Sequence, residues 1–111
     1  HSGQLEDAYE LLNKSLQINI NLFGDSNHLI CKNLIGIAHY HSLSGQFQES
    51  SILLEQVLKI YKETFGEGHP EVAVALTHLG NLYFELSQYK ISMSYFSDAK
   101  KIIENFINIR R

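Results

Sequence analysis

Apolar side chains recur along this chain at intervals of three and four residues, the spacing of one face of an α-helix. One such face carries Leu76, Leu79 and Tyr83, and another carries Leu54 and Val57. No segment alternates apolar and polar residues in the way that predicts a half-buried strand. The pattern therefore predicts an all-α protein. We expect five helices, at about residues 4–21, 27–43, 46–64, 69–86 and 88–108.

The helical pattern repeats with a shift of 42 positions. Gly3-Gln4-Leu5 returns as Gly45-Gln46-Phe47 and again as Ser87-Gln88-Tyr89, and other apolar positions follow in the same register. A fixed period of this size indicates stacked helix pairs, each of which needs its neighbours to bury its apolar face. We therefore expect residues 1–111 to form a single array. Its parts are the second half of a repeat at 3–24 and full repeats at 25–66 and 67–108.

Particular residues mark where these helices begin and end. Pro70 suits the first turn of a helix, where its missing N–H costs nothing, and Asn27 is a good N-cap for the equivalent helix one repeat earlier. Gly45 and Gly66 are predicted to stop helices in a left-handed conformation.

Small residues on both helices of a unit predict close helix contacts. They are Ala38, Gly80, Ser50, Ser92 and Ala99. The residues expected to be largely buried around them are Leu54, Leu76, Leu79, Tyr83 and Phe96.

The chain resembles the tetratricopeptide repeat family. The residues that carry the resemblance are Leu76, Leu79-Gly80, Tyr83, Tyr89, Ser92, Phe96 and Ala99, with Leu76 where the family usually has tryptophan. The 42-residue unit and the string at 64–73, TFGEGHPEVA, are similar to the repeats of kinesin light chains. Thr77-His78 stands where those repeats usually carry two asparagines that contact peptide backbone, which weakens the case for carrying over the light chain's cargo specificity.

The resemblance implies a superhelix of antiparallel helix pairs whose concave face binds a peptide or a partner helix. The residues that it places on that face are Lys32, Ile35, His39, Ser42, Thr77, His78, Asn81, Phe84 and Glu85, with Val74 beside them. Polar groups there could read a peptide main chain, while Ile35 and Phe84 offer apolar contact. The alternative is that this face is only a solvated helix surface.

Composition and charge favour protein partners over other kinds. A net charge of -3 gives no reason to expect nucleic acid or an anionic membrane, and no apolar run approaches the length of a membrane span. Cys31 is the one cysteine, so an internal disulfide is excluded and a cytoplasmic location is the expectation. We expect no cofactor and no metal. His39 and His41, two residues apart on a helix, point to nearly opposite sides.

No arrangement of residues indicates catalysis: nucleophile elbows and phosphate-binding glycine loops are absent from the sequence. The chain is therefore interpreted as a non-catalytic interaction scaffold. Two alternatives are a peptide-sensing part of a larger regulator and assembly-supporting repeats of a larger enzyme. The apolar segment 100–109 and the unpaired first helix indicate either a longer array or self-association.

Overall fold

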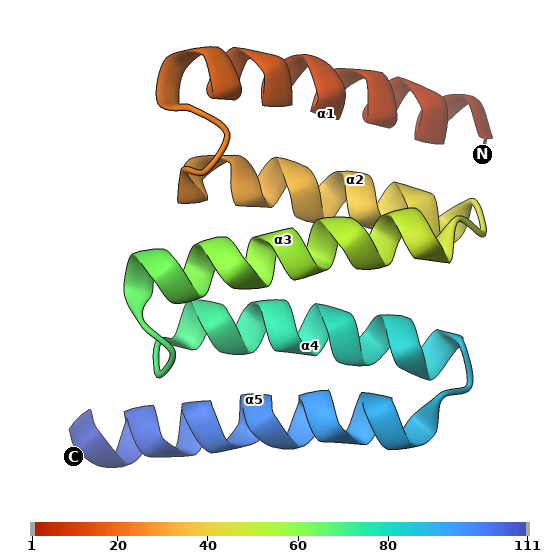
Figure 1. The fold of residues 1–111 in the computed structure, drawn as a ribbon. Helices are drawn as coiled ribbons and strands as arrows, with labels where there is room; N and C mark the ends of the chain where they lie inside the picture. The colour runs from red at the N-terminus through yellow and green to blue at the C-terminus, as the bar shows by residue number, and fades with distance from the viewer. Residues whose placement is uncertain (1, 111) are drawn as a thin grey trace.

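The computed structural model describes residues 2–110, which fold into antiparallel α-helices stacked in chain order (Figure 1). The described residues contain no strand, so the all-α prediction is confirmed, as is the number of helices. The stack is flat, with principal extents of 45 × 36 × 20 Å. The elements are α1 (Ser2–Phe23), the 3-10 turn η1 (His28–Ile30), α2 (Cys31–Leu43), α3 (Phe47–Phe65), α4 (Pro70–Glu85) and α5 (Tyr89–Arg110).

One predicted helix begins later than expected. Asn27 is a cap, since its side chain accepts a hydrogen bond from the backbone N–H of Leu29 at 2.9 Å. The element that it caps is the turn η1, however, and α2 begins only at Cys31, so the predicted start at residue 27 was wrong. An N-cap satisfies an early N–H in a 3-10 turn as well as in an α-helix, so the sequence signal is the same for both.

The other helix ends follow their sequence signals with one difference. His69 is the N-cap of α4 and Pro70 occupies its first turn, while the Nδ1 atom of His69 accepts from the backbone N–H of Glu71 at 3.0 Å. Gly45 has a φ of +79° as predicted. Gly66 also has a positive φ, +88°, but its ψ of 157° is extended rather than left-handed helical. That conformation is open almost only to glycine.

The core lies along the interfaces of α2, α3, α4 and α5. Of the residues predicted to be largely buried, Leu54, Leu76 and Leu79 are buried. Tyr83 and Phe96 are only half-buried, so that part of the prediction was wrong. The Tyr83 ring stacks on that of Tyr95 with centroids 5.7 Å apart, at the edge of the core rather than within it.

Small residues bring the helices of each pair together as expected. Ala38, Ser50, Gly80, Ser92 and Ala99 are all buried. A Cβ atom added at Gly80 would lie 2.5 Å from the Phe96 ring, so α4 and α5 meet at this point. The buried Ser92 hydroxyl donates to the carbonyl of Gly80 at 2.8 Å, which satisfies a polar group in the same contact.

A polar network joins α1 to α2. The side-chain amide of the buried Asn33 donates to the Ser15 hydroxyl at 3.0 Å and accepts from the amide of Asn19 at 2.9 Å. One repeat later, at a shift of 42 positions, the place of Asn33 is taken by the fully buried Ala75. The interface between α1 and α2 is therefore more polar than the one between α3 and α4.

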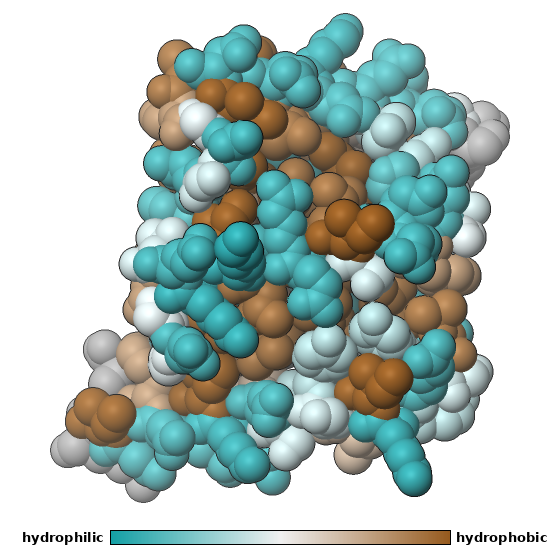
Figure 2. Space-filling view, in the orientation of Figure 1, coloured by the Kyte–Doolittle hydropathy of each residue, from teal (hydrophilic) through white to brown (hydrophobic). Residues whose placement is uncertain are grey.

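Both end helices expose apolar side chains. Leu11 and Leu22 on α1 are each 67% exposed, and Ile109 on α5 is 84% exposed. In Figure 2, apolar surface is visible over both of these helices and also between hydrophilic side chains over the middle of the stack. None of the described helices is long and apolar enough to cross a membrane.

Candidate functional site

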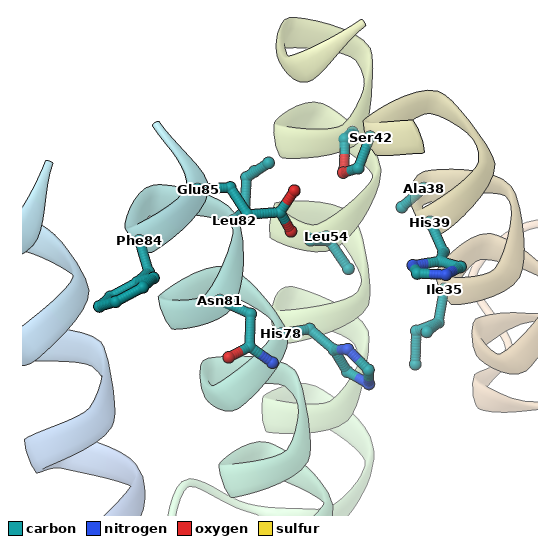
Figure 3. A pocket seen from close by; sticks show the side chains of 11 residues that line it. Ile35, Ala38, His39, Ser42, Leu54, His78, Asn81, Leu82, Phe84 and Glu85 are labelled. Atoms are coloured by element: carbon teal, nitrogen blue, oxygen red, sulfur yellow. The ribbon is translucent and has the colours of Figure 1, made fainter. Parts of the chain in front are cut away.

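A groove lies between α2 and α4, with α3 behind it (Figure 3). Its volume is about 350 Å³. The residues that line it are Ile35, Ala38, His39 and Ser42 from α2, Ser50 and Leu54 from α3, and His78, Asn81, Leu82, Phe84 and Glu85 from α4. It is formed because helices α2 and α4, which are equivalent in successive repeats, lie on one side of α3.

Seven of the nine residues predicted for the concave face line this groove. They are Ile35, His39, Ser42, His78, Asn81, Phe84 and Glu85. The other two lie in neighbouring hollows. Lys32 lines a hollow of about 230 Å³ with Glu71 and Val74, and Thr77 lines one of about 210 Å³ beside Ile103 of α5. The Thr77 hydroxyl also donates to the carbonyl of Ala73 at 2.8 Å, so it is already engaged within its helix.

The sequence prediction missed the floor of the groove. Ala38, Ser50, Leu54 and Leu82 are buried, yet each also contributes to its lining. Helical spacing had assigned Ala38, Ser50 and Leu54 to the core alone. A floor shared between core and groove could have been foreseen from the small size of Ala38 and Ser50, because small residues leave space above them.

Three polar side chains in the groove are exposed, namely His39, Asn81 and Glu85. His39 and Asn81 face the solvent from α2 and α4. No hydrogen bond links either side chain to another of the described residues, which leaves both available to a ligand. Ser42 differs, since its hydroxyl lies 2.9 Å from that of Ser50 and is hydrogen-bonded to it.

His78 reaches from α4 toward α2, and Figure 3 shows its imidazole and that of His39 in the space between the two helices. Burial lowers the pKa of His78, and the positive charge that His39 can carry lowers it further. His78 is therefore neutral at neutral pH and can both donate and accept a hydrogen bond. Among residues 2–110, no group of three histidine, cysteine or acidic side chains lies close enough to hold a metal ion.

Apolar contact in the groove comes from both walls. Ile35 is half-buried on α2, while Phe84 on α4 is 58% exposed. The Phe84 ring meets the Tyr89 ring edge to face, with centroids 5.1 Å apart, and so marks the rim on the side of α5. The site therefore combines hydrogen-bonding groups with apolar surface, as peptide-binding grooves do.

Cys31 lies in the core and not in the groove. Cys31 is fully buried, and its counterpart one repeat later, Ala73, is buried as well. Burial raises the pKa of the Cys31 thiol to about 11, with a smaller contribution from the charge of Glu71. A buried thiol with a raised pKa is a poor nucleophile, so the structure agrees with a packing role.

The thiol gives a simple test of this packing. We expect an alkylating reagent at about pH 8 to modify Cys31 at least roughly a hundredfold more slowly in the folded chain than in urea, because the raised pKa reduces the thiolate fraction by that factor. The raised pKa also stabilises the folded chain at pH values below the ordinary thiol pKa. This stabilisation is lost as the pH rises toward about 11. Mass spectrometry of timed samples measures the rate. Equal rates with and without urea would contradict the burial of Cys31.

The tetratricopeptide repeat family model matches two overlapping parts of the chain, residues 1–63 and 30–105. The chain belongs to the tetratricopeptide repeat family. Repeats of this family generally mediate protein–protein interactions.

Solved structures with the same fold include the nearly identical tetratricopeptide-like repeats of a kinesin light chain from Podosopora anserina. That structure has a TM-score of 0.77 and 25% identity, over 91% of this chain and 48% of that one. A variant of the same protein gives a TM-score of 0.76 with the same identity and coverage.

A curated relative is the human clustered mitochondria protein homolog, 24% identical over 101 residues. The match takes in 91% of this chain but only 8% of the human protein. The chain thus spans about half of the solved repeat structures and a small part of this relative.

Proposed function

We propose that the groove between α2 and α4 binds an extended peptide or a helix of a partner protein. The observation that carries the proposal is the convergence of His39, His78 and Asn81 on one cavity. Leu54, Leu82 and Phe84 add apolar surface to the same cavity. Such a surface can bond a peptide main chain through its polar groups while it buries apolar side chains. We infer one continuous array, with full repeats at 25–66 and 67–108, because the groove needs the equivalent helices of both.

Removing the exposed polar groups of the groove should weaken this binding. We expect His39→Ala and Asn81→Ala each to reduce affinity roughly 5- to 150-fold, the equivalent of losing a hydrogen bond worth about 1–3 kcal/mol. Thermal stability should stay nearly unchanged, because neither side chain is bonded within the described chain. The measurement is a titration of a partner recovered by pull-down, followed by calorimetry.

Lys59→Ala is the matched control. Lys59 is exposed on α3, in a hollow lined by Glu55, Leu58, Lys62 and Glu63 that shares no residue with the groove. Its replacement should leave affinity unchanged. Loss of binding in the Lys59 variant alone would refute the groove as the binding site. Normal binding by all three variants would point instead to the exposed apolar end helices.

A further inference from the structure

The groove carries an acidic group without a partner. Among the residues that line it, Glu85 is the one carboxylate, and no lysine or arginine stands beside it. Glu85 is exposed, and no described side chain forms an ion pair or hydrogen bond with it. Figure 3 shows its carboxylate reaching from α4 toward α2, into the space of the groove.

The backbone adds negative potential at the same end. Helices α2 and α4 run in the same direction, so both carboxyl ends lie at the same end of the stack (Figure 1). Each helix end carries a partial negative charge of about half a unit from its unpaired carbonyl groups. Glu85 is the last residue of α4, whose final turn contains no basic residue to offset that charge.

Among the described residues, no lysine or arginine lines the groove to supply a permanent positive charge. Burial and the neighbouring His39 lower the pKa of His78, which keeps its ring neutral. Lys32 lies in the first turn of α2, toward the opposite end of the groove, and shares its hollow with the carboxylate of Glu71. The end of the groove at Glu85 is therefore acidic, and its charge is not balanced within the described chain.

We propose, on the basis of the peptide-binding function above, that the partner segment carries a lysine or arginine side chain that pairs with Glu85. The apolar stem of such a side chain can lie against Leu54 and Leu82 on the floor while its charged head reaches the carboxylate and the helix ends. An acidic segment meets repulsion there and is disfavoured. Charge complementarity of this kind sets which partners bind.

The test is selection from a library of short random peptides displayed on phage, with the chain as bait. Peptides recovered on the unaltered chain should be enriched in lysine and arginine over aspartate and glutamate. Glu85→Lys should lower the affinity of a recovered basic peptide about tenfold or more, because an attraction between opposite charges becomes a repulsion between like charges. Glu63→Lys is the matched charge reversal on α3, outside the groove, and should cause little change.

The outcomes separate this inference from the function on which it rests. The recovered peptides could bind His39→Ala and Asn81→Ala more weakly, yet show no enrichment in basic residues and bind Glu85→Lys normally. That result would overturn the pairing with Glu85 but not peptide binding in the groove. If no peptide is recovered, or if the recovered peptides bind every groove variant with unchanged affinity, peptide binding in the groove is overturned as well. Equal losses of peptide affinity in Glu85→Lys and Glu63→Lys would show a general effect of net charge and would also overturn the pairing.

Discussion

Replacing Leu79 by alanine is expected to lower the free energy of unfolding by about 2–5 kcal/mol. Leu79 is fully buried on α4, within the cluster that includes Leu76 and Leu82. The shorter side chain loses the free energy of burying its methyl groups and leaves a cavity, which a close-packed helix stack fills only in part. Urea unfolding followed by circular dichroism measures the change.

Leu22→Ala is the matched control for this substitution. Leu22 is 67% exposed near the end of α1, so its truncation removes little buried surface. We expect a change within about 0.5 kcal/mol. Similar losses of unfolding free energy in the Leu79 and Leu22 variants would contradict the placement of the core between α4 and its neighbours.

Gly80→Leu should destabilise the fold by about 1–3 kcal/mol, although leucine is the better helix former. A Cβ at this position would lie 2.5 Å from the Phe96 ring, closer than real atoms approach. The ring would have to move, or α4 and α5 would have to separate. The gain of up to about 1 kcal/mol in helix propensity is smaller than this cost.

Two further variants isolate the steric cause. Gly68→Leu should cost little by comparison, because a Cβ there meets no atom within 4 Å. Combining Gly80→Leu with Phe96→Ala should cost less than the sum of the two single changes, because the smaller residue makes room. Thermal unfolding of the set measures this coupling. A Gly80→Leu variant more stable than the parent would show that α4 and α5 do not touch at this glycine.

The helices could be predicted because their signals are local. The spacing of Leu76 and Leu79, the cap at Asn27, the first-turn Pro70 and the positive φ of Gly45 all arise from the physics of one helix or its end. The exact start of α2 could not be predicted, since Asn27 caps a 3-10 turn with the same hydrogen bond.

Interactions between helices were harder to predict. The hydrogen bonds of Asn33 with Ser15 and Asn19 join residues that no periodicity connects. The shared floor of the groove was missed for the same reason, because Leu54 contributes to both core and cavity from a third helix. The walls of the groove were predictable, since His39 and Asn81 each lie on a helix face opposite an apolar stripe.

Photocrosslinking from the groove tests its role most directly. Phe84 and Ile52 are both 58% exposed, but Phe84 lines the groove and Ile52 lies on α3 outside it. A benzophenone amino acid at either position can be combined with a peptide selected on the unaltered chain. We predict an efficient crosslink from position 84 and little or none from position 52. Crosslinking from position 52 with none from position 84 would contradict binding in the groove.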